Sequence, residues 1–204
     1  MNPNINPRTN QYFNENPAAL TQERMLNFSI FDMDFRFTTN NGLFSHSKVD
    51  AGSILLLEHI PPITGSLLDL GCGYGVIGIV LGKKNNITLT MSDINSIALG
   101  YAKKNAKLNN VQAQCIHSDG FESLTDKYDT IVLNPPIHAG KEVMYKLYAE
   151  AAQHLHPSGV LYIVIQKKHG AQSTLNVLKE LFKKCQTLHK KKGYYIFQCA
   201  RGIE

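Results

Sequence analysis

Short apolar runs alternate with longer amphipathic stretches over most of the chain. Most of the runs are rich in Val, Ile and Leu, and their lengths are typical of buried strands. The predicted strands are 66–70, 87–92, 111–116, 128–133 and 158–166. The predicted helices between them are 75–84, 95–109, 140–155 and 170–184. Strands that alternate with helices in this way predict an α/β fold with a mostly parallel, doubly wound sheet.

The N-terminal part of the chain departs from this alternation. Residues 1–26 are rich in Asn and Pro and poor in large apolar residues, which predicts a flexible arm. Aromatic and aliphatic residues then alternate on either side of Asp32, and Asn40-Asn41-Gly42 is typical of a turn. Residues 27–46 are therefore predicted to form a β-hairpin extension. The rest of the chain completes a single predicted domain over 27–204.

The C-terminal part departs from the alternation as well. The apolar runs 185–190 and 194–200 are joined by a lysine-rich turn that is too short for a parallel crossover. We therefore predict that they are antiparallel neighbours at the end of the sheet. One more helix is expected before the sheet, starting just after Ser47 and ending near Ile60.

Composition narrows the class of protein. A chain of 204 residues with 43% hydrophobic and 18% charged residues is typical of one soluble globular domain. The net charge of +5 mildly favours a polyanionic partner. The sequence has no apolar signal segment and no membrane-spanning run, so a cytoplasmic protein is expected. The four cysteines form no Cys-x-x-Cys pair and are predicted to be reduced thiols: Cys72, Cys115, Cys185 and Cys199.

A glycine-rich segment follows the first predicted strand of the sheet. Gly71, Gly73 and Gly75 suit a loop that turns tightly or lets a ligand approach the main chain. Asp69 directly precedes this loop and has the reach to meet the ammonium group of a ligand. The spacing Gly73-x-Gly75-x-x-Gly78 also satisfies the dinucleotide fingerprint, so the loop alone does not select one nucleotide cofactor. A structural turn without a ligand is the alternative.

Two further acidic residues follow the next predicted strands. Asp93 ends one strand, where a carboxylate accepts hydrogen bonds from the hydroxyls of a ribose in NAD and S-adenosylmethionine alike. Asp119-Gly120 follows the next strand, where an acid suits an adenine amino group; a helix cap is the alternative. The residues predicted to bind the cofactor are Asp69, Gly71, Gly73, Gly75, Asp93, Ile94, Asp119, Gly120 and Asn134. An acid that meets an ammonium group favours a cofactor with positive charge at one end.

Asn134-Pro135-Pro136 follows the predicted strand 128–133 and supplies the candidate catalytic chemistry. The exocyclic amine of a nucleobase is a poor nucleophile, because its lone pair is delocalised into the ring. The side-chain carbonyl of Asn134 and the backbone carbonyl of Pro135 can accept the two amine hydrogens and free that lone pair. Each proline holds the residue before it extended, so both carbonyls are aimed before substrate arrives. The alternative is that the prolines only end a strand.

Methyl transfer fits this pair of acceptors, because a sulfonium donor is already activated and mainly needs in-line alignment with the amine. The sequence has no Pro-Cys pair, which a carbon-methylating base enzyme would need. The cationic product loses its proton easily, so no dedicated general base is required. No metal site is predicted, since His154 and His156 lack partners at ligand spacing.

These motifs resemble those of the class I S-adenosylmethionine-dependent methyltransferases. More narrowly, residues 27–202 are similar to the methyltransferase domain of ribosomal RNA guanine-N2 methyltransferases that act on the small subunit. The matching residues are Phe44-Ser45, Val49-Asp50-x-Gly52-Ser53, Asp69 to Gly75, Asp93, Asn134 to Ile137, Gly140-Lys141 and Lys192-Gly193-Tyr194-Tyr195. The resemblance implies a Rossmann-like, seven-stranded sheet with an antiparallel last strand. It also implies that Asp69, Gly71, Gly73 and Asp93 hold S-adenosylmethionine, while Asn134 and Pro135 hold the target amine.

The resemblance further implies an RNA partner, either ribosomal RNA or the small ribosomal subunit. The residues predicted to contact substrate are Phe44, Ile137, His138, Lys141, Lys167 and Lys168. For His138 a bystander role is the alternative. A second basic segment, Lys190 to Lys192, lies beside Tyr194 and Tyr195 and also suits RNA. Most other lysines are expected on solvated helix faces.

Two departures from the family keep other functions open. Large members carry a second domain before this one, whereas only an arm and a hairpin precede it here. Ile137 stands where amine methyltransferases often have a stacking aromatic residue, which disfavours adenine. Adenine-N6 methylation and glutamine-amide methylation of a protein are therefore alternatives within the enzymes. A nicotinamide-dependent reductase and a non-enzymatic RNA-binding module are alternatives outside them.

Overall fold

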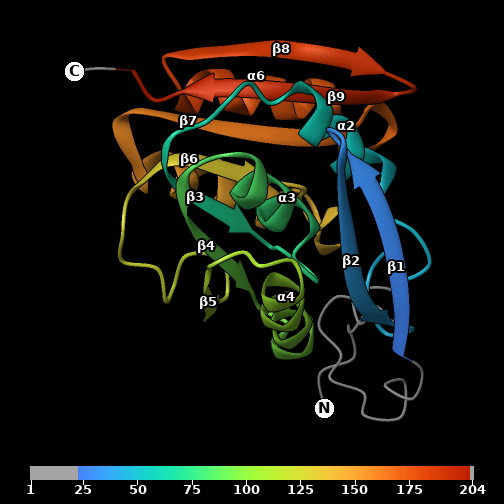
Figure 1. Cartoon of the computed structure of the whole chain (residues 1–204). Helices are drawn as coiled ribbons and strands as arrows, with labels where there is room; N and C mark the ends of the chain where they lie inside the picture. Colours follow the sequence, from blue (N-terminus) through green and yellow to red (C-terminus); the bar gives the residue numbers. More distant parts are fainter. Residues whose placement is uncertain (1–22, 203–204) are drawn as a thin grey trace, which may run out of the picture.

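The computed structural model describes residues 23–202 (Figure 1). The strands are β1 (Glu23–Ile30), β2 (Met33–Asn40), β3 (Gly65–Leu70), β4 (Ile87–Asp93), β5 (Gln114–His117), β6 (Tyr128–Leu133), β7 (Leu155–Gln166), β8 (Lys184–Lys191) and β9 (Tyr194–Ala200). The helices are α2 (Ala51–His59), α3 (Val76–Lys84), α4 (Ser96–Leu108), α5 (Lys141–Gln153) and α6 (Ala171–Leu181), with short 3₁₀ turns η2 (Ile137–Ala139) and η3 (Lys167–His169). Each strand and helix expected between residues 47 and 200 is present, with its ends shifted by a few residues.

Seven strands form one sheet in the order β5-β4-β3-β6-β7-β9-β8. β3, β4, β5, β6 and β7 pair in parallel, whereas β9 is antiparallel to both of its neighbours, β7 and β8. This order confirms the predicted Rossmann-like sheet with an antiparallel last strand. After β5 the chain crosses to the other side of β3, so the strand order reverses between β3 and β6. In doubly wound folds, ligands bind at the carboxyl ends of the strands at such a reversal.

Helices cover both faces of the sheet. The buried side chains of α2, α3 and α4 share one apolar core with one face. Those of α5 and α6 share a second core with the opposite face. Neighbouring residues of a strand point to opposite faces, so Leu67 of β3 belongs to the first core and Leu68 to the second. This double coverage explains why the central strands are continuous apolar runs in the sequence.

β1 and β2 form a separate hairpin beside the sheet (Figure 1). Its two-residue turn is Phe31–Asp32, with positive φ angles of 57° and 56°, which match the twist of the flanking strands. The Lys84 ammonium lies 3.6 Å from the centre of the Phe31 ring in a cation–π contact. β1 begins at Glu23, so the predicted boundary of the arm at residue 26 is corrected. The remainder of that arm lies outside the described residues.

Two asparagines, one in α4 and one at its C-cap, hold this hairpin against the domain. The Thr38 amide donates to Asn105 Oδ1 at 2.7 Å, and Asn105 Nδ2 donates to the Thr38 carbonyl at 2.9 Å. Asn109, one helical turn later, makes the same pair with Arg36 at 3.0 Å and 2.8 Å. The two carboxamides therefore satisfy the edge of β2 as a neighbouring strand would. Asn105 Nδ2 also donates to the Tyr74 carbonyl at 2.9 Å, which ties the hairpin to the glycine-rich loop.

We expect Asn105→Ala to lower the free energy of unfolding by about 3 kcal/mol, because it leaves buried main-chain groups unpaired. Asn105 is fully buried, so water cannot replace the lost partners. Denaturant unfolding measures the change. Asn176→Ala on the exposed side of α6 is the matched control and should change stability by less than about 0.5 kcal/mol. Equal stability of the two variants would show that the hairpin does not depend on this contact.

The structure corrects the prediction that all four cysteines are reduced. Cys185 of β8 and Cys199 of β9 are directly opposite one another in the antiparallel register and form a disulfide. Cys72 and Cys115 are free thiols. The paired cysteines are 14 residues apart, and only the register of the two strands brings them together.

Candidate functional site

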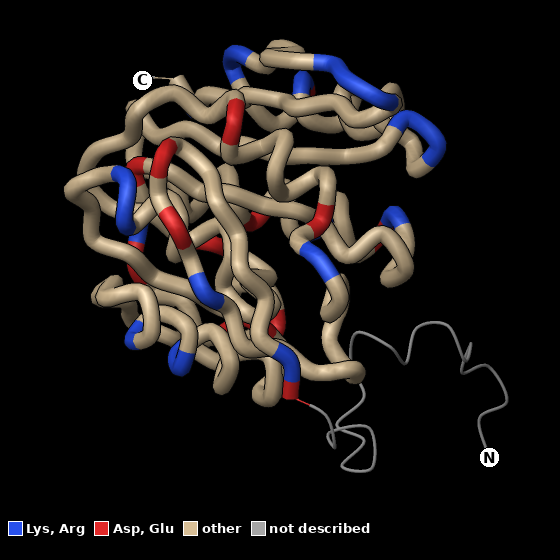
Figure 2. The backbone as a smooth tube through the Cα atoms, turned by 45° about the vertical axis from the view of Figure 1, so that its right-hand side comes forward, with Lys and Arg blue, Asp and Glu red and all other residues tan. Residues whose placement is uncertain are grey.

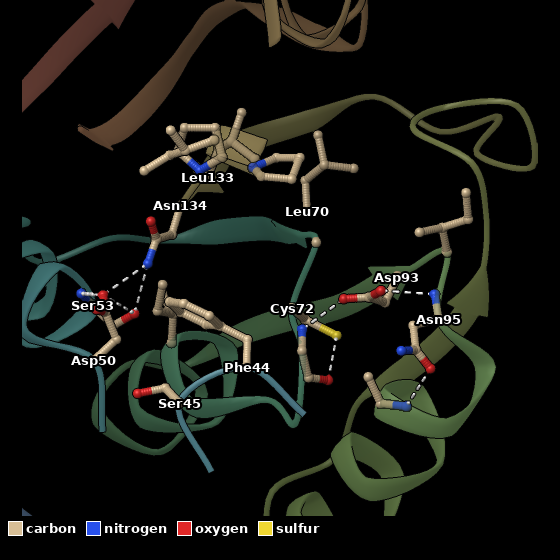
Figure 3. Close-up of a pocket in the computed structure, with 18 of the residues that line it drawn as sticks. Phe44, Ser45, Asp50, Ser53, Leu70, Cys72, Asp93, Asn95, Leu133 and Asn134 are labelled. Carbon is tan, nitrogen blue, oxygen red and sulfur yellow. Dashed lines mark hydrogen bonds between the residues drawn. The ribbon is translucent and has the colours of Figure 1, made fainter. Parts of the chain in front are cut away.

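The carboxyl ends of three neighbouring strands bring the predicted motifs together. Leu70 of β3 pairs with Ser92 of β4 on one side and with Leu133 of β6 on the other. The residues that follow these three positions therefore leave the sheet side by side: Gly71, Asp93 and Asn134. Figure 3 shows Asn134 and Asp93 on opposite sides of one pocket, with Cys72 of the glycine-rich loop between them.

This pocket is a cavity of about 390 Å³. The predicted site residues that line it are Phe44, Gly71, Gly73, Asp93, Ile94, Asp119, Gly120, Asn134, Pro135, Pro136, Ile137 and His138. The predicted site residues that lie outside its lining are Asp69, Gly75, Lys141, Lys167 and Lys168. One cavity thus joins the predicted cofactor residues to the predicted acceptors for the amine.

The glycine-rich loop exposes its main chain to the cavity at two positions. Gly71 and Gly73 have positive φ angles of 66° and 56°, and no heavy atom lies within 4 Å of the place where a side chain would begin. These glycines therefore allow a ligand to approach the main chain closely. Gly75 has a different role, because a Cβ there would lie 2.8 Å from the Ile79 side chain. It permits close packing at the start of α3 and does not face the cavity.

Asp93 holds the glycine-rich loop and faces the cavity. Its Oδ2 accepts from the Gly73 amide at 2.7 Å, and its Oδ1 accepts from the Asn95 amide at 2.8 Å. Burial raises the pKa of Asp93, and the main-chain donors oppose that change by stabilising the carboxylate. Each carboxylate oxygen keeps a second lone pair for a hydroxyl group. This geometry supports the predicted contact with a ribose.

Asp69 lies beneath the loop and is 1% exposed. Its Oδ2 accepts from the Gly78 amide in α3 at 2.7 Å. Burial raises the pKa of Asp69 to about 7, with the nearby Asp93 adding to the increase and the Gly78 amide opposing it. Asp69 lies outside the cavity lining, and its predicted contact with an ammonium group stays a prediction. Its hydrogen bond to Gly78 fixes the start of α3 and, through it, the loop.

Asp119 and Gly120 lie at the rim of the cavity beyond β5. Asp119 is exposed and starts a turn, since its carbonyl accepts from the Glu122 amide at 3.1 Å. No helix follows, so the alternative of a helix cap is not supported. Gly120 has a positive φ of 53°, and a Cβ there would lie 2.9 Å from the Leu147 side chain. The turn therefore comes close to α5 and leaves the Asp119 side chain available to a ligand.

Asn134 has a defined orientation on the opposite side of the cavity. Its Nδ2 donates to Asp50 Oδ2 at 3.0 Å and to Ser53 Oγ at 3.1 Å. The carboxamide oxygen therefore points away from this pair, as Figure 3 shows. Pro135 is buried, and the chain then turns through Pro136 into η2. The two contacts engage Nδ2 and not Oδ1, so the predicted acceptor role of the Asn134 oxygen is compatible with this orientation.

Several polar residues of the cavity were not among the predicted site residues: Asp50, Ser53, Gln166, His169 and Tyr194. Asp50 caps α2, which corrects the predicted start of this helix just after Ser47. Gln166 Nε2 donates to Tyr194 Oη at 2.5 Å. Gln166 ends β7 at the same sheet edge as Asn134, so the argument from strand ends would have found it. Asp50 and Ser53 belong to the motif that resembles the family, but they do not follow a strand, because a helix before the sheet brings them to the cavity.

The charge of the cavity suits a cationic ligand. Asp50, Asp93 and Asp119 line it, and its described lining contains no Lys or Arg. S-adenosylmethionine carries a sulfonium, an ammonium and one carboxylate, and its net positive charge is therefore attracted to this cavity. Among residues 23–202, no group of three or more His, Cys, Asp or Glu side chains is arranged to bind a metal. No helix in the same range is long and apolar enough to cross a membrane.

Comparison with known sequences identifies the family. The methyltransferase small domain family matches residues 34–198. The uncharacterized protein YbxB of Bacillus subtilis is 39% identical over 196 residues, which cover 93% of this chain and 98% of YbxB. Ribosomal RNA small subunit methyltransferase C of Vibrio vulnificus is 35% identical over 199 residues, which cover 92% of this chain and 57% of that protein.

Solved structures agree with this match. The 16S rRNA N2 methyltransferase of T. thermophilus, in complex with AdoMet and guanosine, superposes with a TM-score of 0.80 and 30% identity. The match covers 88% of this chain and 50% of that one, so this chain spans about half the length of that enzyme. The fold, the acidic cavity and the matched sequence all point to the same family. The chain belongs to the methyltransferase small domain family, and it is a class I S-adenosylmethionine-dependent methyltransferase, as predicted.

Proposed function

We propose that this protein transfers a methyl group from S-adenosylmethionine to the exocyclic N2 amine of guanine in RNA of the small ribosomal subunit. The observation that carries the proposal is the orientation of Asn134 within a cavity that also contains Asp93. Nδ2 is engaged by Asp50 and Ser53, so the carboxamide oxygen is available to an amine. Asp93 and the open glycines provide a place for the nucleoside part of the donor at the other side of the cavity.

In the proposed reaction, the protein prepares the amine. Asn134 Oδ1 and the Pro135 carbonyl each accept one hydrogen of the exocyclic amine, which draws the nitrogen towards tetrahedral geometry. Bound S-adenosylmethionine supplies a methyl group already activated on a sulfonium. The apolar side chains of Leu70, Leu133 and Ile137 line the space beside these acceptors and limit access of water. As the nitrogen–carbon bond forms, the carbon–sulfur bond breaks and S-adenosylhomocysteine is the neutral leaving group. The cationic nitrogen then loses one proton to solvent water, a step that does not require a dedicated general base.

The choice of ribosomal RNA is supported by the named relatives. Small subunit methyltransferase C of V. vulnificus and the T. thermophilus 16S rRNA enzyme are 35% and 30% identical to this chain. The aligned region covers only 57% and 50% of the lengths of these two enzymes. The substrate of this chain is therefore a proposal. Guanine N2 is favoured over adenine N6 because Ile137 lacks the stacking ring expected for adenine. A ribosomal substrate also agrees with the cytoplasmic location expected from the sequence.

Basic residues beside the cavity supply a surface for an RNA backbone. Lys167 and Lys168 of η3 are exposed, and the Lys167 amide donates to Gly193 in the β8–β9 turn at 2.7 Å. Lys190 and Lys191 end β8, and Lys192 lies in that turn. The Lys190 ammonium lies 4.8 Å from the centre of the Tyr195 ring. Blue segments accordingly gather at the upper right of the molecule in Figure 2. Lys141, Lys167 and Lys168 are therefore proposed to contact phosphates outside the cavity.

The double substitution Lys167→Glu/Lys168→Glu should weaken RNA binding. It should also make the negative slope of log affinity against log salt shallower by about 1–2. The reason is that each lysine lost at a phosphate removes one released counterion. Filter binding across a salt series measures the slope, with S-adenosylmethionine affinity measured in parallel and expected to stay constant. Lys127→Glu/Lys179→Glu is the matched control, since both lysines are exposed and lie outside the cavity lining. An equal effect of both pairs would indicate net charge alone and count against the proposed surface.

Mass spectrometry of RNA nucleosides and of release-factor peptides tests the function. Purified protein and labelled S-adenosylmethionine are incubated with small ribosomal subunits, with naked 16S RNA and with a release factor. We expect N2-methylguanosine in one of the RNA samples, and its loss from 16S RNA of cells that lack the gene. N6-methyladenosine or methylated glutamine would instead establish one of the alternative substrates. Methylation of none of these samples by protein that binds S-adenosylmethionine would contradict the proposal.

A further inference from the structure

The orientation of Asn134 is set by its contacts and not by the side chain itself. A carboxamide presents an acceptor on one side and a donor on the other, and the two sides have nearly the same shape. If Nδ2 faced the target amine, two donors would meet and the amine would be repelled. The contacts to Asp50 Oδ2 at 3.0 Å and Ser53 Oγ at 3.1 Å place Nδ2 on the far side.

Asp50 is itself held in place by α2. As the N-cap residue, it accepts from the Ser53 amide at 2.9 Å and from Ser53 Oγ at 3.4 Å through the same Oδ2 that meets Asn134. Gly52 of α2 packs closely against Asp50 and Tyr194. A Cβ at Gly52 would lie 2.9 Å from Asp50 Oδ2 and 3.0 Å from the Tyr194 ring. Glycine at this position therefore lets Asp50 and Tyr194 approach the same point of the cavity wall.

We propose that Asp50 and Ser53 are positioning residues that fix the acceptor side of Asn134 towards the target amine. The inference rests on the proposed function, because it assigns a role to these residues in holding the same amine. The hydrogen bond from Nδ2 to the Asp50 carboxylate is charge-assisted and therefore outweighs a bond to a neutral group. It also draws electron density towards Oδ1, which strengthens that oxygen as an acceptor while positive charge develops on the amine. The start of α2 is thus coupled to an acceptor 84 positions away in the sequence.

Asp50→Asn tests this role without removing the helix cap, because Asn caps helices as well as Asp does. We expect kcat to fall by about 10- to 100-fold, with little change in the affinity for S-adenosylmethionine measured by calorimetry. Ser53→Ala removes a neutral acceptor and should lower kcat by about 2- to 10-fold. Asp126→Asn at an exposed site outside the cavity lining is the matched control. Unchanged kcat in Asp50→Asn, with wild-type protein active, would overturn the inference.

A reciprocal exchange separates positioning from general structural support. Asn134→Asp places two carboxylates about 3 Å apart in the cavity wall, so their repulsion should reduce both kcat and thermal stability. Adding Asp50→Asn restores one amide and one carboxylate in exchanged places, and the amide at position 50 can donate to the carboxylate at 134. We expect the double variant to recover at least 10-fold in kcat over Asn134→Asp alone. If the fold-loss of kcat in the double variant equals the product of the fold-losses in Asn134→Asp and Asp50→Asn, the inference is overturned.

The two failures are distinguishable. If wild-type protein methylates neither RNA nor protein, the proposed function fails whatever the variants do. If wild-type protein is active on any amine substrate but the exchange gives no recovery, the function stands and the positioning role fails. Thermal unfolding of each variant identifies any loss that arises from the fold alone.

Discussion

Asn134→Ala should lower kcat for methyl transfer by about 100- to 1,000-fold while leaving the affinity for S-adenosylmethionine nearly unchanged. Removal of one preorganised hydrogen-bonding group at a reacting centre has an effect of this size. The substitution deletes the acceptor that holds one amine hydrogen, whereas Asp93 and the glycine-rich loop keep their own contacts. Single-turnover methylation with saturating RNA measures the chemical step, and calorimetry measures donor binding.

The matched control is Asn176→Ala, the same change at an exposed position of α6 outside the cavity lining. It should leave both measurements unchanged. RNA binding by Asn134→Ala should also persist, because the basic residues that are proposed to contact phosphates lie outside the cavity. Full activity of Asn134→Ala would exclude the amine-holding mechanism and favour a non-enzymatic RNA-binding module.

Asp93→Ala should raise the dissociation constant for S-adenosylmethionine by about 100-fold. Two charge-assisted hydrogen bonds to the ribose hydroxyls would be lost, each corresponding to about a 10-fold change or more. The Gly73 and Asn95 amides, now 2.7 Å and 2.8 Å from the carboxylate, would also lose their acceptor. Calorimetry with S-adenosylmethionine and with its demethylated product measures the loss, which should be similar for both because they share the ribose.

Asp126→Ala serves as the control for this change, since Asp126 is exposed in the loop before β6 and lies outside the cavity lining. Asp93→Asn should have an intermediate effect, because one side of an amide cannot accept from the main-chain donors. If Asp93→Ala binds S-adenosylmethionine with wild-type affinity, the donor must bind in another part of the cavity. In that case Asp119 would be the next residue to substitute.

The fold was largely predictable because its signals are local. The apolar runs fixed the strands of the main sheet, and the short lysine-rich turn predicted that β8 and β9 are antiparallel neighbours. The sites at strand ends were predictable for a related reason. Parallel strands place their carboxyl ends at one edge, and the register of Leu70 with Ser92 and Leu133 places Gly71, Asp93 and Asn134 together.

Packing decides the environment of the side chains that the sequence left open, and it overturned one prediction, that of four reduced cysteines. Asp69 precedes the glycine-rich loop in sequence, yet its alternating position on β3 turns it under the loop towards Gly78. Asp119 was equally compatible with a helix cap until the structure placed a turn there. Lys141, Lys167 and Lys168 follow the active edge in sequence but lie outside the cavity lining. The disulfide between Cys185 and Cys199 depends on strand register.

By itself the sequence determined the order of strands and helices and the sheet edge at which Asn134 and Pro135 line the cavity. These features follow from the periodicity of apolar residues and from motifs of neighbouring residues, both of which can be seen directly in the sequence. Only the tertiary structure decided that Asp50 and Ser53 orient Asn134, and that Asn105 and Asn109 hold the hairpin. Such contacts join residues more than sixty positions apart, and a hydrogen bond depends on where folding places its donor and acceptor, which no local pattern specifies.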